Sequence, residues 1–220
     1  MRLAGVLDER LRIALAKALF INTLQAVRDC SGVEVLVITG DPEALRIAND
    51  LGVGTQQEAA IEGLNAALAA AVASFNELQG LRFAYLPIDL PGLVAQDVGA
   101  IFSRMKTCDD QQILITPDSR EAGTNFLSWP GDSGLRMCFG PGSFGLYLNQ
   151  AASLSIPVEQ IDMPGLRYDL DAPEDLPVLP SAAHSTMAST SPQSAVHAVQ
   201  AAQTFITWVA DRVHVAEYRH

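Results

Sequence analysis

The sequence predicts an α/β fold in which a mostly parallel sheet is covered by helices on both faces. Residues 33–39, 81–88 and 112–116 are apolar, partly β-branched runs with the composition of buried strands. They alternate with predicted helices, of which residues 9–28 and 58–78 show the clearest helical periodicity and residues 143–154 form a further one. Such alternation is typical of sheets whose parallel strands are joined by helices that pack on the two faces.

Shorter elements with recognisable boundaries lie between these. Residues 33–39 run into Gly40-Asp41-Pro42, a turn sequence that indicates the end of a strand. Residues 58–78 are rich in alanine, and one helical face carries Ile61, Leu64, Leu68, Val72 and Phe75. The remaining predicted elements are helices at 43–51 and 95–105, short strands at 135–139 and 157–162, and a last helical turn that starts near Pro173.

The chain is expected to form one domain followed by a tail. Its 220 residues, 49% of them apolar, are enough to bury one sizeable core, which we place in residues 1–180. Residues 181–194 are rich in Ser, Ala, Thr and Pro and are typical of a flexible linker. Apolar residues then recur at helical spacing, which predicts an amphipathic C-terminal helix within 195–220. This helix would pack on the body, pair with a second copy to form a homodimer, or be marginal alone.

Charge and composition exclude several classes of partner. The formal net charge is −11 and there are only two lysines, so a broad basic face for nucleic acid is not expected. No apolar run is long enough to span a membrane. Three widely spaced cysteines match neither a disulfide framework nor a metal site, and Asp8 and Glu9 interrupt any signal segment. These features favour a cytoplasmic protein, and an anionic substrate would then need local N–H donors, an arginine or a bridging cation.

The positions of the histidines narrow the possible chemistry. All four lie at or after His184, so residues 1–183 contain none. A Ser-His-Asp or Cys-His centre and a His-ligated zinc are therefore not expected in the main domain. Carboxylates and hydroxyls remain as the groups that could carry catalysis.

The stretch 123–144 holds two loops of small residues. Gly123-Thr124-Asn125 lies before the short apolar run, and Gly140-Pro141-Gly142-Ser143 follows it. Glycines let backbone N–H groups approach a ligand, and a helix that starts near Ser143 would add its N-terminal N–H groups and dipole. We interpret the two loops as a binding site for a phosphate or carboxylate. The alternative is two ordinary turns around an edge strand.

Aspartates at predicted strand ends form a second candidate site. Asp89 follows one strong strand, and Asp169 and Asp171 lie far away in the sequence. Magnesium prefers oxygen ligands and is usually held by one or two carboxylates, substrate phosphates and water. Ligands of parallel sheets bind beyond the carboxyl ends of the strands, so Asp89, Asp118 and the Gly140 loop are expected to share one rim. The alternative for each aspartate is a role in capping a turn or helix.

Three weaker signals leave alternatives open. Residues 140–145 spell G-x-G-x-x-G, which taken alone indicates a dinucleotide-binding oxidoreductase, but a βαβ unit with further strands should then follow. Asn65, within Gly63-Leu64-Asn65, would face either a ligand or solvent. Arg120, Arg136 and Arg167 would act either as phosphate clamps or in surface ion pairs.

Taken together, these motifs resemble the 2-phospho-L-lactate guanylyltransferase family, which includes phosphoenolpyruvate guanylyltransferase-like members. The resemblance covers most of residues 2–177, and its segments occur in the order of the family. They are Pro87-Ile88-Asp89-Leu90-Pro91, Gly123-Thr124-Asn125, Phe139-Gly140-Pro141-Gly142-Ser143-Phe144 and the run 164–176 that contains Asp169-Leu170-Asp171.

The resemblance implies a glycosyltransferase-A-like nucleotidyltransferase fold of the nucleotide-diphospho-sugar transferase type. The implied enzyme joins GTP to 2-phospho-L-lactate or phosphoenolpyruvate, releases pyrophosphate and serves coenzyme F-420 biosynthesis. By motif, Thr124, Gly140 and Ser143 would bind the acceptor, and Gly63, Leu64 and Asn65 would lie near the nucleotide. Asp89 and Asp171 would be catalytic, and with Asp169 they would hold magnesium.

Two departures from the family bear on this expectation. Family members begin earlier, with a strand and a lysine-containing nucleotide loop before the position of Arg2, so either the start of the chain is misassigned or the domain is N-terminally truncated. Tyr147 stands where the family often has histidine. The alternatives are a nucleotidyltransferase for another phosphorylated acceptor, or an inactive truncated paralogue that acts as a binding module.

Overall fold

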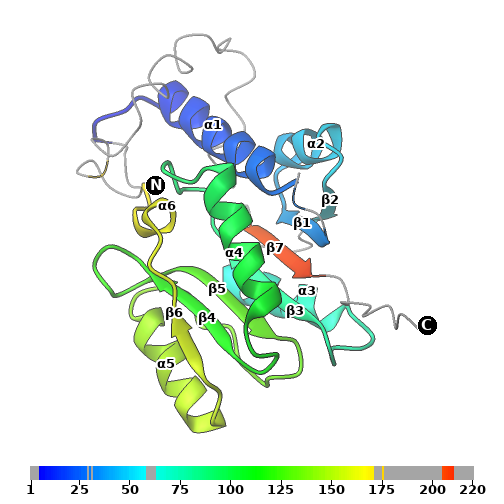
Figure 1. The fold of residues 1–220 in the computed structure, drawn as a ribbon. Helices are drawn as coiled ribbons and strands as arrows, with labels where there is room; N and C mark the ends of the chain where they lie inside the picture. The colour runs from blue at the N-terminus through cyan, green and yellow to red at the C-terminus, as the bar shows by residue number, and fades with distance from the viewer. Residues whose placement is uncertain are drawn as a thin grey trace.

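The computed structural model of the chain describes residues 5–28, 30, 32–57, 63–170, 175 and, for the backbone only, 205–210 (Figure 1). Its helices are α1 (Glu9–Arg28), α2 (Pro42–Asp50), α3 (Leu64–Ala73), α4 (Ala95–Thr107), α5 (Ser143–Leu154) and α6 (Pro164–Arg167). Its strands are β1 (Val33–Thr39), β2 (Gly54–Gln57), β3 (Arg82–Leu86), β4 (Ile113–Pro117), β5 (Thr124–Pro130), β6 (Val158–Gln160) and β7 (Phe205–Ala210). The predicted α/β class is confirmed.

The described strands form one seven-stranded sheet in the order β2-β1-β7-β3-β5-β4-β6. The prediction of a mostly parallel sheet is wrong for the pairings, because only β1–β2 and β4–β6 are parallel. The pairs β1–β7, β7–β3, β3–β5 and β5–β4 are antiparallel. β5 follows β4 through a short turn and runs antiparallel to β4 and β3. β7 runs antiparallel to its two neighbours, β1 and β3. The other five strands run in one direction, so β1, β3 and β4 end at the same edge of the sheet.

Strand β7 replaces part of the predicted C-terminal helix. It pairs with β1 over six residue pairs and with β3 over five, and is the only strand that joins the two halves of the described sheet (Figure 1). Phe-Ile-Thr-Trp-Val-Ala is β-branched and aromatic, which favours an extended strand. In a central strand, N–H and C=O groups are bonded on both sides, and this outweighs a helical spacing of apolar residues. Residues 181–194 and the rest of 195–220 lie outside the described part of the chain.

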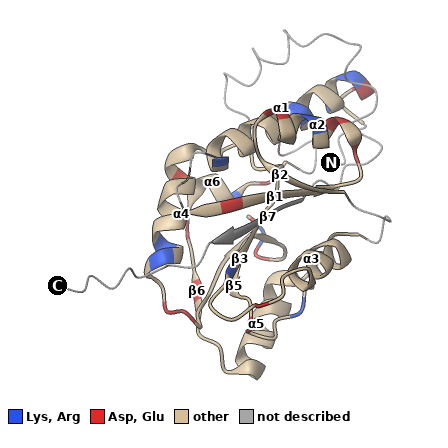
Figure 2. Ribbon diagram, turned by 90° about the vertical axis from the view of Figure 1, so that its right-hand side faces the viewer, with Lys and Arg blue, Asp and Glu red and all other residues tan. Residues whose placement is uncertain are grey.

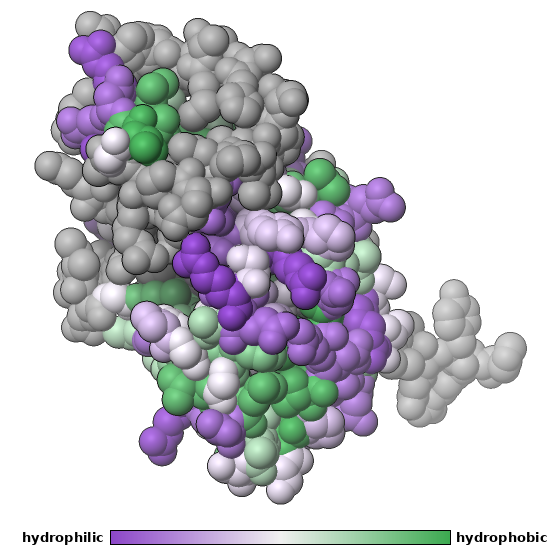
Figure 3. Space-filling model, turned by 90° about the vertical axis from the view of Figure 1, so that its left-hand side faces the viewer, coloured by the Kyte–Doolittle hydropathy of each residue, from purple (hydrophilic) through white to green (hydrophobic). Residues whose placement is uncertain are grey.

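The two faces of the sheet carry separate apolar cores. Alternate strand residues such as Val37 and Leu86 pack with α1, α2, α4 and α6, whereas Ile38 and Tyr85 belong to the core under α3 and α5. Helices therefore cover both faces, as predicted (Figure 2). Helix α5 leaves three leucines, Leu146, Leu148 and Leu154, partly exposed. Apolar side chains gather in the lower part of the face that Figure 3 shows, the side on which α5 lies. Within the described residues, no helix is both long and apolar enough to cross a membrane.

Two local predictions around the central stretch are corrected. Thr124 and Asn125 begin strand β5 rather than forming a loop, and residues 135–139, predicted as a strand, have no regular secondary structure. The predicted helix over 58–78 is described from Leu64 to Ala73, and the chain after it turns. α5 starts at Ser143, as the Gly140–Ser143 loop suggested.

Candidate functional site

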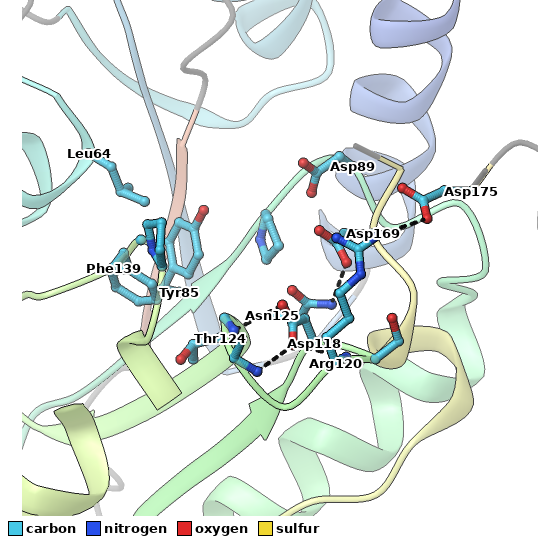
Figure 4. Close-up of a pocket in the computed structure, with 16 residues that line it drawn as sticks. Leu64, Tyr85, Asp89, Asp118, Arg120, Thr124, Asn125, Phe139, Asp169 and Asp175 are labelled. Atoms are coloured by element: carbon cyan, nitrogen blue, oxygen red, sulfur yellow. Dashed lines mark hydrogen bonds and ion pairs between the residues drawn. The ribbon is translucent and has the colours of Figure 1, made fainter. Parts of the chain in front are cut away.

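A pocket of about 370 Å³ lies at the edge where β3 and β4 end (Figure 4). Because β5 runs antiparallel to both strands, its first residues lie at this edge too. The predicted meeting of Asp89, Asp118 and the Gly140 loop at one rim is therefore confirmed. The pocket is lined by Leu64, Tyr85, Pro87, Asp89, Asp118, Ser119, Arg120, Ala122, Gly123, Thr124, Asn125, Phe139, Gly140, Pro141, Asp169 and Asp175.

Asp118 shapes the loop between β4 and β5. Its carboxylate accepts hydrogen bonds from the backbone N–H groups of Arg120 (3.1 Å), Ala122 (2.8 Å) and Gly123 (2.9 Å). A Cβ atom at Gly123 would lie 2.8 Å from Oδ2 of Asp118, so only glycine lets the loop close so tightly. The carboxylate of Asp118 therefore stabilises the loop by accepting its N–H groups, and Thr124, which follows the loop, lines the pocket.

We expect Asp118→Ala to loosen this loop. The substitution removes the acceptor of three N–H groups, and the free energy of unfolding should fall by about 1–3 kcal/mol. Amide hydrogen exchange at Gly123 should accelerate, and urea titration should give the stability change. Asp132→Ala, at an exposed turn outside the pocket, is the matched control. Unchanged exchange at Gly123 in Asp118→Ala would contradict this role.

The two predicted acceptor loops meet through their hydroxyls. Oγ of Ser143 donates a hydrogen bond of 2.9 Å to Oγ1 of Thr124, which lines the pocket. Ser143 itself is fully buried and is not a lining residue. Gly142 has φ of 78° and precedes α5 without a side-chain cap, and Gly140 has φ of 129°. Thr124 and Gly140 thus face the pocket directly, whereas the Ser143 hydroxyl lies behind Thr124.

The strap, which we define as residues 134–139, connects β5 to this loop without forming a strand. Side chains bind its backbone instead. The Asn65 amide exchanges hydrogen bonds with Phe139 N (2.7 Å) and O (3.0 Å). Gln150 does the same with Arg136 N and O (both 3.0 Å), and the Tyr147 hydroxyl accepts from Cys138 N at 3.0 Å. The side chain of Asn65 therefore faces the strap rather than solvent.

One wall of the pocket is apolar and aromatic, with Leu64, Tyr85 and Phe139 along it (Figure 4). The rings of Tyr85 and Phe139 lie 4.3 Å apart between centroids. Tyr85 is only 6% exposed. Burial, with a smaller contribution from Asp89, raises the pKa of the Tyr85 hydroxyl. A neutral phenol therefore faces the pocket. Its role could not be predicted from the sequence, because Tyr85 is one of several apolar or aromatic residues in a buried strand.

The opposite wall is acidic (Figure 4). The backbone N–H of Leu170 donates to the carbonyl of Asp89 at 2.9 Å, which holds the Asp169 segment beside the end of β3. The amide of Asn125 donates to Leu166 O (2.9 Å) and to Asp169 Oδ1 (3.4 Å). Asp89 and Asp169 are thus lining residues of the same pocket, as predicted, whereas Asp171 lies outside the described residues.

This pair fits what magnesium requires but does not complete a site. Carboxylate oxygens are the ligands that magnesium prefers, and substrate phosphates and water usually supply the remainder. Among the described residues there is no cluster of three or more His, Cys, Asp or Glu side chains that could hold a metal. A bound magnesium would supply charge neutralisation at phosphate oxygens.

The pocket is unbalanced in charge. Among the lining residues that the structure describes, Asp89, Asp118, Asp169 and Asp175 are acidic and only Arg120 is basic. Arg120 lies 3.9 Å from Asp175. Arg136 and Arg167 are not lining residues, and Arg167 pairs with Asp162 at 3.5 Å. A polyphosphate ligand would therefore need a cation to bind here.

Fold and pocket define an α/β protein with a ligand site of carboxylates, hydroxyls and a glycine loop at the carboxyl ends of its strands. The G-x-G-x-x-G at 140–145 follows the strap rather than a strand, so it lacks the context of a dinucleotide fingerprint.

The sequence matches the family described as guanylyl transferase CofC like over residues 1–189, and the chain belongs to this family. It is 35% identical over 179 residues to phosphoenolpyruvate guanylyltransferase of Conexibacter woesei, a match that covers 81% of this chain and 80% of that protein. The protein of the same name from Rubrobacter xylanophilus is 35% identical over 176 residues, with 80% and 84% covered. A 3-phospho-D-glycerate guanylyltransferase of Phenylobacterium zucineum is 30% identical over 178 residues, with 79% and 80% covered. The chain is accordingly a nucleotidyltransferase enzyme.

Proposed function

We propose that this enzyme joins GTP to phosphoenolpyruvate or 2-phospho-L-lactate and releases pyrophosphate, a step of coenzyme F-420 biosynthesis in the cytoplasm. The observation that carries the proposal is the pocket itself, in which a glycine loop and hydroxyl face two carboxylates across one cavity. The names of the relatives support guanylyl transfer and a small phosphorylated acid as acceptor.

The reaction forms one bond and breaks one. A phosphate oxygen of the acceptor attacks the α-phosphorus of GTP, and the bond from that phosphorus to the bridging oxygen of the β-phosphate breaks. Pyrophosphate leaves with the electron pair of that bond. The attacking oxygen is already anionic near neutral pH, since the second pKa of a phosphate monoester is about 6. No general base is therefore required for this step.

The described residues would align the reactants and balance charge. Thr124 and the backbone at Gly140 would hold the acceptor's phosphate and carboxylate, and the hydrogen bond from Ser143 to Thr124 supports this role. Leu64 and its neighbours Gly63 and Asn65, at the start of α3, would lie near the nucleotide. Asp89 and Asp169, with Asp171, would hold magnesium, which lowers the barrier by neutralising charge on the phosphates.

The test is pyrophosphate release from GTP and magnesium with each of three acceptors: phosphoenolpyruvate, 2-phospho-L-lactate and 3-phospho-D-glycerate. The third is included because a relative at 30% identity carries its name. We expect release with phosphoenolpyruvate or 2-phospho-L-lactate, none without acceptor, and little when ATP or CTP replaces GTP. Release only with 3-phospho-D-glycerate would replace the proposed acceptor. No release with any of the three would reject the proposed reaction and favour another acceptor or a binding role.

A further inference from the structure

The strap is held at two points, Phe139 at its pocket end and Arg136 nearer its start, by the same kind of contact. At the end near the pocket, the Asn65 amide binds both N and O of Phe139, and nearer the start the Gln150 amide binds both N and O of Arg136. Each side chain thus takes the place that a neighbouring strand would have, which satisfies backbone groups that no strand pairs. The contact made by Asn65 lies beside the pocket, whereas the contact made by Gln150 does not.

Asn65 joins two parts of the pocket that are far apart in sequence. Its neighbour Leu64, the first residue of α3, lines the pocket, as do Phe139 and the adjacent Gly140. Gln150 instead lines a second hollow of about 570 Å³, together with Arg136 of the strap and Leu146 of α5. The Asn65 amide therefore fixes the separation between the start of α3 and the Gly140 loop, and the Gln150 amide does not.

We propose that Asn65 is a positioning residue that couples the nucleotide side of the pocket to the acceptor side through the Phe139 peptide. The inference rests on the proposed function, in which the start of α3 lies near GTP and Gly140 near the acceptor. Both polar atoms of the Asn65 amide are engaged by Phe139, at 2.7 Å and 3.0 Å. Its contribution to catalysis is therefore the placement of the Gly140 backbone rather than the recognition of the guanine base.

Asn65→Ala and Asn65→Asp are the test variants, and Gln150→Ala is the matched control. Alanine removes both hydrogen bonds and so loosens the Gly140 backbone, and KM for the acceptor should rise roughly 10-fold or more. Aspartate still accepts from Phe139 N but cannot donate to Phe139 O, so it should not restore the acceptor KM. Binding of GTP without acceptor, measured by titration calorimetry, should stay within about 2-fold in all three variants.

The outcomes separate this role from its rivals. A weakened affinity for GTP in Asn65→Ala would show a direct nucleotide contact and overturn the inference. An equal rise of the acceptor KM in Gln150→Ala and Asn65→Ala would also overturn it, because any loosening of the strap would then suffice. If the wild-type chain transfers no guanylyl group, the proposed function is rejected, but the role of Asn65 in holding the strap is still to be tested. Amide hydrogen exchange at Phe139, faster in Asn65→Ala and unchanged in Gln150→Ala, would then decide whether Asn65 holds the strap as the inference requires.

Discussion

Thr207→Pro is expected to abolish cooperative folding of the domain or to lower its stability severely. Thr207 is paired with Leu36 of β1 and with Tyr85 of β3, so it lies in the interior of the sheet. In a strand with neighbours on both sides, every N–H is directed at one neighbour or the other, and proline has none to donate. The carbonyl left without a donor costs about 1–3 kcal/mol, and the ring disturbs the ladder further. Domains are typically stable by only about 5–15 kcal/mol, so this is a large share.

Thr207→Val is the matched control, because valine keeps the N–H and the β-branched shape that strands favour. A second pair of variants tests the strand as a whole. Removal of residues 205–220 should expose the facing edges of β1 and β3 and yield an insoluble or non-cooperatively unfolding protein, whereas removal of 211–220 leaves β7 complete. Circular dichroism during thermal unfolding and the soluble yield are the measurements. A chain without 205–220 that unfolds at the wild-type temperature would show that β7 does not close the sheet.

Strong local periodicity was sufficient to predict several elements. Helix α1, strand β1 and helix α5 have the bounds that the sequence indicated. An apolar pattern predicted α1 and β1, whereas the glycine loop before Ser143 indicated where α5 begins. The shared rim also followed from the sequence, since Asp89 and Asp118 directly follow strands that run in the same direction. These predictions depend on local composition and on the general geometry of α/β sheets.

Strand β5 could not be predicted in this way, because its polar residues are satisfied by partners far away in sequence. Asn125 binds the carbonyl of Leu166, and the Ser128 hydroxyl accepts from Arg82 at 3.3 Å. A polar segment with such partners is as buried as an apolar one, but its composition resembles a loop. The same reason explains Asn65 and Tyr85, whose roles depend on how α3 and the strap pack.

The position of β7 is a long-range property of the same kind. Residues 205–210 contain both β-branched side chains and a spacing of apolar residues that suits a helix. Only the unpaired edges of β1 and β3 decide between the two conformations, and neither edge is visible in the local sequence.

Asp89→Asn is expected to reduce guanylyl transfer by about 100-fold or more while leaving the fold intact. Asparagine has the shape of aspartate but lacks its charge, so it removes one carboxylate from the acidic wall that Asp89 and Asp169 form. If this wall holds magnesium against the phosphates of GTP, the loss should weaken metal binding as well as catalysis. The measurement is pyrophosphate release as a function of magnesium concentration, and the variant should need more magnesium for half-maximal activity.

Asp50→Asn is the control for this prediction, because Asp50 pairs with Arg46 on the exposed surface of α2 and is not a lining residue of the pocket. Thermal unfolding of both variants would separate loss of catalysis from loss of structure. Asp169→Asn should resemble Asp89→Asn in its magnesium dependence if the two carboxylates share one ion. An Asp89→Asn enzyme that keeps the wild-type rate and the wild-type magnesium requirement would instead assign the acidic wall to the structure of the rim, and magnesium would then have to be held by the substrate alone.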